Sequence, residues 1–172
     1  MLVSASDLLS ALKAKLVALK LDAAASDEPL FETVELYGNK SLGQALSDLT
    51  ITKGRVCLIV PLGLTRVSDD KPSHRVLTRR FLQVNLLIAD RAYYKAAQVA
   101  VFGGDKNLGV IEMAERVETA LEGHDLSDYG PAIWGDGAQQ TLTDPQKKDA
   151  PNREVWIDDL VIPAGTTEAV CE

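Results

Sequence analysis

The sequence predicts a single α+β domain with a mostly antiparallel sheet and helices packed on one face. Its apolar spacing gives the order helix, strand, short helix, two strands, helix, two strands, which does not alternate as a doubly wound fold would. Adjacent strands joined by turns or hairpins favour antiparallel pairing. The 172 residues, 46% hydrophobic and 25% charged, suit one core. We therefore treat residues 1–172 as one domain.

The first third of the chain predicts a helix, a short strand and a second, brief helix. Residues 6–20 follow a capping-box-like start at Ser4–Asp7 and carry leucines at helical spacing, namely Leu8, Leu9, Leu12, Leu16 and Leu19. Alternation in Phe31–Tyr37 predicts a short strand near a sheet edge. Ser41 is placed to cap a brief helix whose apolar residues are Leu42, Ala45, Leu46 and Leu49.

Two strands with a polar excursion between them form the centre of the sequence. Arg55–Pro61 is almost continuously apolar and predicts a central strand, which should end at Pro61 because proline has no N–H for the ladder. Arg79–Ala89 predicts the second strand, with Leu82, Val84, Leu86 and Ile88 on one face. Residues 63–78 then form a long protruding loop or an extended hairpin. The residues expected there at an interface are Leu64, Arg66, Val67, Asp69, Asp70, Lys71, His74 and Arg75.

The second half predicts helices followed by two more strands. A helical segment at Ala92–Phe102 is broken by glycines, and a clearer helix at Leu108–Leu121 has Ile111, Ala114, Val117 and Leu121 facing inward. Ile133–Leu142 reads as a strand that passes a Gly-Asp-Gly turn or bulge. Val155–Ile162 predicts the last strand.

Composition excludes several classes of function. The formal charge of −7 argues against phosphate-backbone binding as the main task, which needs clustered Lys and Arg. We expect no membrane contact, since no stretch approaches the roughly 20 apolar residues of a span and no signal segment is visible. Cys57 and Cys171 are too few for a disulfide framework, so a reducing compartment is expected.

No motif predicts a catalytic, cofactor-binding or metal site, and we do not expect an enzyme. His74 and His124 each lack a second ligand-type residue at metal-site spacing. Cys57 lies mid-strand among apolar neighbours, where an inert thiol is expected. Asp158 and Asp159 are adjacent in a strand, so they point to opposite faces, and both are interpreted as surface groups. Gly103–Gly109 is interpreted as a helix-linking turn rather than a nucleotide loop.

The layout resembles the tail-terminator, or tail-completion, proteins of long-tailed bacteriophages, especially the branch in Mu-like phages. The resemblance spans most of the chain. It is carried by the N-terminal helix Asp7–Lys20, the pair Arg55–Leu62 and Arg79–Ala89 with the polar excursion between them, the helix Leu108–Leu121 with its Leu-Glu-Gly ending, the Trp134 region and the closing strand Val155–Ile162.

The resemblance implies a subunit that forms a ring, expected to be a hexamer, on the last ring of the tail tube. Such a ring stops tube polymerisation and presents a surface to the head-tail connector or neck protein, and in contractile tails it also touches the sheath protein. It implies a place in the neck of the virion after assembly in the host bacterial cytoplasm. Genomic DNA would pass through the lumen without specific binding, which an acidic chain favours.

Two other interpretations remain open on sequence alone. A different neck or head-completion protein of the virion would share this layout and differ chiefly in its partner. A small enzyme or ligand-binding domain belongs to another class and would be a monomer with a closed apolar pocket. Oligomeric state separates this last class from a ring-forming subunit.

Overall fold

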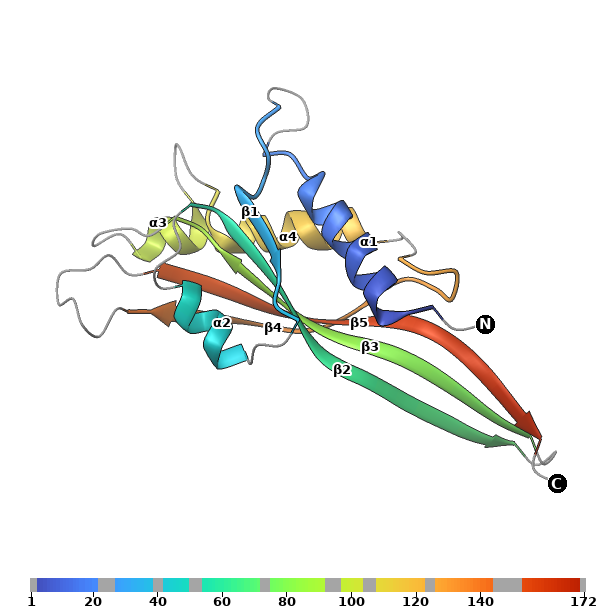
Figure 1. The fold of residues 1–172 in the computed structure, drawn as a ribbon. Helices are drawn as coiled ribbons and strands as arrows, with labels where there is room; N and C mark the ends of the chain where they lie inside the picture. The colour runs from blue at the N-terminus through green and yellow to red at the C-terminus, as the bar shows by residue number, and fades with distance from the viewer. Residues whose placement is uncertain are drawn as a thin grey trace.

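The structure, a computed structural model, describes residues 3–21, 27–38, 42–49, 54–71, 75–91, 97–103, 108–122, 126–143 and 153–170. These residues form four helices and five strands in one sheet (Figure 1). The elements in chain order are α1 (Ala5–Val17), β1 (Thr33–Leu36), α2 (Leu42–Leu49), β2 (Val56–Lys71), β3 (Arg75–Ala89), α3 (Ala97–Phe102), α4 (Val110–Leu121), β4 (Ile133–Leu142) and β5 (Arg153–Val170). The α+β class predicted from the sequence is confirmed.

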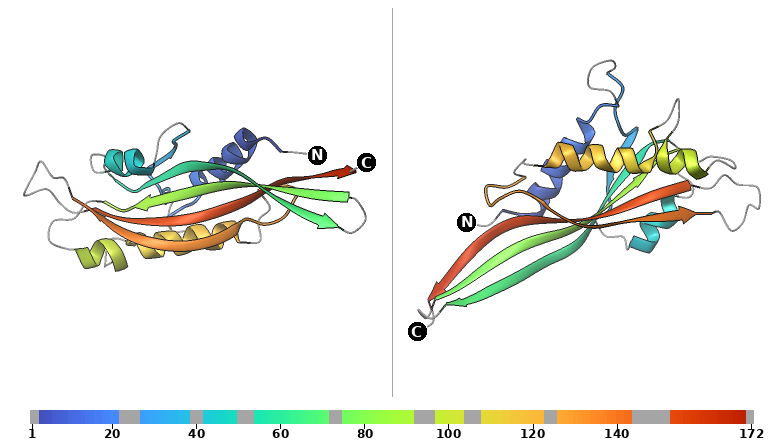
Figure 2. Two further views of the ribbon diagram at one scale, coloured as in Figure 1. Left: turned by 90° about the horizontal axis from the view of Figure 1, so that it is seen from below. Right: turned by 180° about the vertical axis from the view of Figure 1, so that it is seen from behind.

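The sheet has the strand order β1-β2-β3-β5-β4 and is antiparallel except for β1, which pairs in parallel with β2. The long β2–β3 hairpin and β5 make up its centre, and the short β1 and β4 are the edge strands. β1 therefore lies at an edge, as its short alternating sequence predicted. Figure 2 shows how strongly β2, β3 and β5 twist about one another.

Helices cover both faces of the sheet, although α1 and α4 share one face as expected. The α1–α4 face is lined by β2 residues Cys57 and Ile59, whereas Val56, Leu58 and Val60 belong to a second cluster with α2. Successive strand residues point to opposite faces, so α2 packs on the face opposite α1 and α4. The expectation of helices on one face holds for α1 and α4 but not for α2. Only two residues of α2 are fully buried, which is too few for the sequence to predict the side of the sheet on which this helix packs.

The N-terminal helix follows its predicted pattern closely. Leu8, Leu9, Leu12 and Leu16 are buried, and the Ser4 side chain accepts a hydrogen bond from the Asp7 amide at 3.1 Å. The helix ends at Val17, earlier than Lys20, and Lys20 instead forms an isolated bridge with Pro29. No helix in the described ranges has the length and hydropathy needed to cross a membrane.

The predicted inward face of α4 needs one correction. Met113 is fully buried, together with Val110, Ala114, Val117 and Leu121, whereas Ile111 is only half-buried. Val110, Met113, Ala114 and Val117 follow the i, i+3, i+4, i+7 pattern of one helix face, and Ile111 lies one position round the helix from it. The stop predicted at Gly123 falls outside the described residues.

Candidate interaction surface

Three strands extend past the helices as a projecting arm. We define the arm as residues 62–71 of β2, 75–81 of β3 and 163–170 of β5. Figures 1 and 2 show these segments running together away from the helices, which cover only the rest of the sheet. Of the two alternatives for residues 63–78, the structure has the extended hairpin, with β2 and β3 paired out to Lys71 and Arg75.

A matched pair of β-bulges marks the base of the arm. The register of β2 against β3 shifts between Pro61 and Gly63, and that of β3 against β5 shifts opposite Pro163 and Gly165. Both glycines adopt positive φ, 145° at Gly63 and 128° at Gly165, which a side chain would disfavour. Each bulge sits in a Pro-x-Gly sequence and adds twist and bend to its strand without ending it.

Pro61 therefore does not terminate β2, contrary to the sequence prediction. β1 follows β2 only to Ile59, where the Tyr37 amide donates to the Ile59 carbonyl at 2.8 Å. Beyond this point the outer side of β2 faces no strand among the described residues, so the missing N–H of Pro61 costs no ladder bond. β5 continues past Pro163 because this proline lies at the bulge against β3, where proline is tolerated.

Both outer edges of the arm are open in the described part of the chain. On β2 the open edge runs from Leu62 to Lys71. On β5 the Val3 amide donates to the Ala164 carbonyl at 3.1 Å, and from Gly165 to Val170 no further partner strand lies on the outer side. An open strand edge presents backbone N–H and C=O groups that can pair with another chain.

The open edge of β2 also exposes large aliphatic side chains. Leu62 is 54% exposed, Leu64 44% and Val67 45%, with Arg66 among them, and the charged run Asp69–Lys71 follows toward the tip. Charges protect a strand edge against pairing, whereas the more apolar stretch from Leu62 to Val67 is open to strand addition. The arm therefore has the chemistry of a strand-pairing interface.

The arm is also basic compared with the rest of the chain. Residues 62–81 and 163–170 contain five Lys or Arg and three Asp or Glu, which gives the arm a formal charge of +2. Since the whole chain has a formal charge of −7, the residues outside the arm carry −9. Arg66 pairs directly with Arg80 across the β2–β3 ladder, and like charges in that arrangement are destabilising. The buried Nε of Arg80 has no hydrogen-bond partner among the described residues.

The sequence-predicted interface residues lie on the β2–β3 hairpin of the arm, mostly on β2. Leu64, Arg66 and Val67 lie on β2 with described side chains; Asp69, Asp70, Lys71 and Arg75 are placed by backbone pairing alone, and His74 falls outside the described residues. Sequence reasoning missed Arg79, Arg80 and the third strand, residues 163–170. The β-branched pair Thr166-Thr167 is the available signal for that strand, although Pro163 and Gly165 directly before it are unfavourable in strands.

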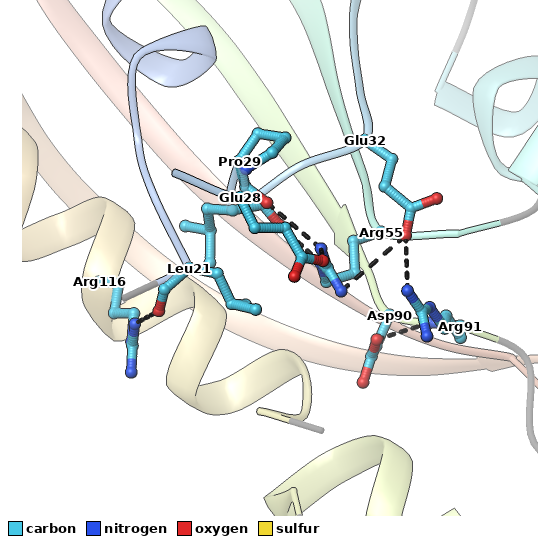
Figure 3. A network of polar contacts seen from close by, with 9 residues as sticks. Leu21, Glu28, Pro29, Glu32, Arg55, Asp90, Arg91 and Arg116 are labelled. Atoms are coloured by element: carbon cyan, nitrogen blue, oxygen red, sulfur yellow. Dashed lines mark hydrogen bonds and ion pairs between the residues drawn. The ribbon is translucent and has the colours of Figure 1, made fainter. Parts of the chain in front are cut away.

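A network of polar contacts at the other end of the sheet holds segments of the fold together (Figure 3). Arg55, 6% exposed, donates through Nε to the Leu30 carbonyl at 2.9 Å and through Nη2 to Glu28 at 2.5 Å. Arg91 donates to Glu32 at 3.0 Å, and this hydrogen bond lowers the pKa of Glu32. These contacts fasten the segment before β1 to the first residues of β2 and thereby position the parallel edge strand.

A second buried arginine anchors the start of β5. Arg153 donates to the carbonyls of Leu49 at 3.2 Å and Gly54 at 2.6 Å, which ties β5 to the end of α2 and the start of β2. Burial lowers its pKa to about 10, opposed by the nearby charge of Asp90. It therefore satisfies two backbone carbonyls inside the fold.

Asp158 and Asp159 do point to opposite faces, but Asp158 is not a surface group. It is 2% exposed, and its Oδ1 accepts a hydrogen bond from Trp156 Nε1 at 2.5 Å. The neighbouring strand provides the space: a Cβ added at Gly137 would lie 2.6 Å from the Trp156 ring. Asp159 is exposed on the other face and accepts a hydrogen bond from Asn85.

Cys57 is buried, as expected, and burial raises the pKa of its thiol well above the usual range, which disfavours the nucleophilic thiolate. Within the described ranges, no three His, Cys, Asp or Glu side chains gather as metal ligands; both histidines lie outside those ranges. Gly109 lies between α3 and α4, and a Cβ there would come within 2.3 Å of the Gly103 nitrogen. This close approach fits the predicted helix-linking turn.

Neither the family models nor the curated proteins with which the chain was compared match its sequence.

Proposed function

We propose that this chain is a structural virion protein of a long-tailed bacteriophage, one that caps the tail tube as a hexameric ring. The ring ends tube polymerisation and joins the tail to the head connector. The observation that carries the proposal is the arm: a three-stranded projection with two open edges and exposed aliphatic residues, on a body whose faces are covered by helices. A surface of this kind suits assembly rather than catalysis.

The physical chemistry of the body supports a non-catalytic role. Arg55 and Arg153 donate to backbone carbonyls, and Glu154 accepts from Thr141 of the neighbouring strand. The thiol of Cys57 is disfavoured as a nucleophile by burial. The order of elements also agrees with the layout from which the resemblance was drawn.

The proposed partners are copies of the same chain, the tail tube protein and the head-tail connector, with the sheath protein added in a contractile tail. In the proposed ring, genomic DNA passes through the lumen without specific binding, and the charge of −9 outside the arm opposes adhesion to phosphates. Assembly would take place in the host bacterial cytoplasm, and the final location would be the neck of the virion.

Two measurements test the proposal in sequence. Light scattering over a concentration series, followed by negative-stain imaging, should give a discrete species near the mass of six subunits with a central hole. Adding that species to growing tubes of the tail tube protein encoded in the same genome should stop their elongation. A ring that leaves elongation unchanged would contradict the terminator role and favour a different neck protein. A monomer with a closed apolar pocket would favour a ligand-binding domain.

A further inference from the structure

We propose that the arms of neighbouring copies pair edge to edge, with β2 of one copy beside β5 of the next in parallel, so that the arms close into one β-barrel. The inference rests on the ring-forming function proposed above and specifies its interface. The partner that it commits to is a second copy of this chain. Its basis is that a single arm carries both a β2 edge and a β5 edge that are open among the described residues.

The directions of the strands make a second copy a suitable partner. β2 and β5 are each antiparallel to β3, so both run outward along the arm. Two arms that point the same way can then pair β2 to β5 in parallel, and the next copy can repeat the contact. Such a head-to-tail interface closes into a ring when its rotation divides the circle.

Barrel geometry fixes the register of this pairing. Three strands about 4.8 Å apart span about 14 Å, and a strand tilt of about 40° offsets neighbouring arms by about 12 Å, which is roughly four residues of 3.3 Å. An even offset is required, because paired residues share a face of the sheet. If the β5 strand of one copy is displaced by about four residues toward the base of the neighbouring arm, Leu64 of β2 lies opposite Thr167 and all of residues 165–170 are paired. A displacement in the opposite direction would pair only Asp70 and Lys71 of β2, with Gly165 and Thr166 of β5.

The same geometry relates the bore to the number of subunits. Six arms give about 18 strands and a circle about 36 Å across between strand axes, in the size range that leaves an aqueous channel. The pairing would also cover the exposed aliphatic side chains of Leu64 and Val67, which now face solvent on the β2 edge. An aqueous bore is what a ring that transmits DNA requires.

Cysteine cross-linking tests the register directly. In a Cys171→Ser background, Leu64→Cys combined with Thr167→Cys should form head-to-tail disulfides when the concentrated full-length protein is oxidised. Non-reducing electrophoresis should show a ladder of covalent multimers that ends at the closed ring. Within one subunit, two strand spacings of about 4.8 Å separate β2 from β5, beyond the reach of about 7 Å between Cα atoms for a disulfide. Every band above the monomer therefore reports contact between copies.

The matched control is Leu64→Cys with Thr166→Cys, because residue 166 lies on the other face of the arm and should give at most a few per cent of the cross-linked product. A ring seen by light scattering with no Leu64–Thr167 cross-link overturns the arm pairing and leaves the terminator function standing. A chain that stays monomeric in the concentrated sample overturns the pairing as well. A covalent ring that does not stop tube elongation supports the pairing and rejects the terminator function.

Discussion

The buried carboxyl of Asp158 should make folding stability fall as the pH rises, and Asp158→Asn should remove that dependence. Burial raises the pKa of Asp158 from an ordinary 3.8 to about 6, with the hydrogen bond from Trp156 acting in the opposite direction and the charges of Glu118 and Asp159 adding to the rise. Its Oδ2 is buried and has no hydrogen-bond partner among the described residues. The native state therefore favours the neutral acid.

The sign follows from proton binding. Between pH 4 and 6 the native state holds the Asp158 proton more tightly than the unfolded chain, so this group stabilises the fold at low pH and the contribution is lost as the pH rises through 6. A change in pKa from 3.8 to about 6 corresponds to at most about 3 kcal/mol. About 2 kcal/mol of it is lost between pH 4 and 8, since the unfolded carboxyl is already partly ionised at pH 4.

The asparagine variant carries no ionisable group and keeps an oxygen that can accept the Trp156 hydrogen bond. Relative to wild type, Asp158→Asn should therefore gain about 2 kcal/mol of stability on going from pH 4 to pH 8. The assay is urea unfolding followed by far-ultraviolet circular dichroism, at a concentration where light scattering gives the monomer. The exposed Asp136→Asn on β4 is the control and should show no such trend. A difference between Asp158→Asn and wild type that is the same at every pH would refute the reasoning.

Three further outcomes are expected. Ser4→Ala removes the side-chain cap of α1 and should cost about 1 kcal/mol in urea unfolding, while Ser4→Asp should retain most of it. Gly54→Ala should cost roughly 1–2 kcal/mol in the same assay, because Gly54 has φ of 81° and the new Cβ would meet the Glu32 carboxylate; an unchanged midpoint would contradict this. In a Cys171→Ser background, Cys57 should react with a thiol reagent only after denaturation, and rapid native labelling would contradict its burial.

Sequence periodicity predicted the body of the fold well, because there each element buries one face. In α1, leucines at helical spacing gave both the helix and its buried side. In β3, Leu82, Val84, Leu86 and Ile88 are all buried in the α1–α4 core, as their alternation predicted. Each of these patterns lies within a single helix or strand, so it can be recognised without knowing which element packs against it.

Periodicity failed at the base of the arm for a definite reason. The sequence predicts that β2 ends at Pro61, since proline removes a ladder donor. That rule holds for a strand with neighbours on both sides, and at Pro61 β2 has a described partner strand on one side only. Strand order decides whether the rule applies, and strand order is not a local property of the sequence.

Strand alternation contains a signal for the burial of Asp158. It shares its face of β5 with Trp156, Leu160 and Ile162, so alternation alone placed it toward the larger core. What the sequence could not show was that Gly137 lies opposite and leaves room for the indole ring and the carboxyl together. A buried acid needs such a space and a donor, and these came from a neighbouring strand and from residue 156.

In the proposed ring, the division between body and arm would separate the residues that hold the fold together from those that meet another chain. The body buries its sheet under helices on both faces and uses Arg55 and Arg153 to secure the strand ends away from the arm. The base of the arm is buried against the body at Ala164, whereas the β2 edge beyond it exposes Leu62, Leu64 and Val67. In the proposed ring, these exposed residues gain contacts from another chain, so substitutions there should alter assembly far more than folding.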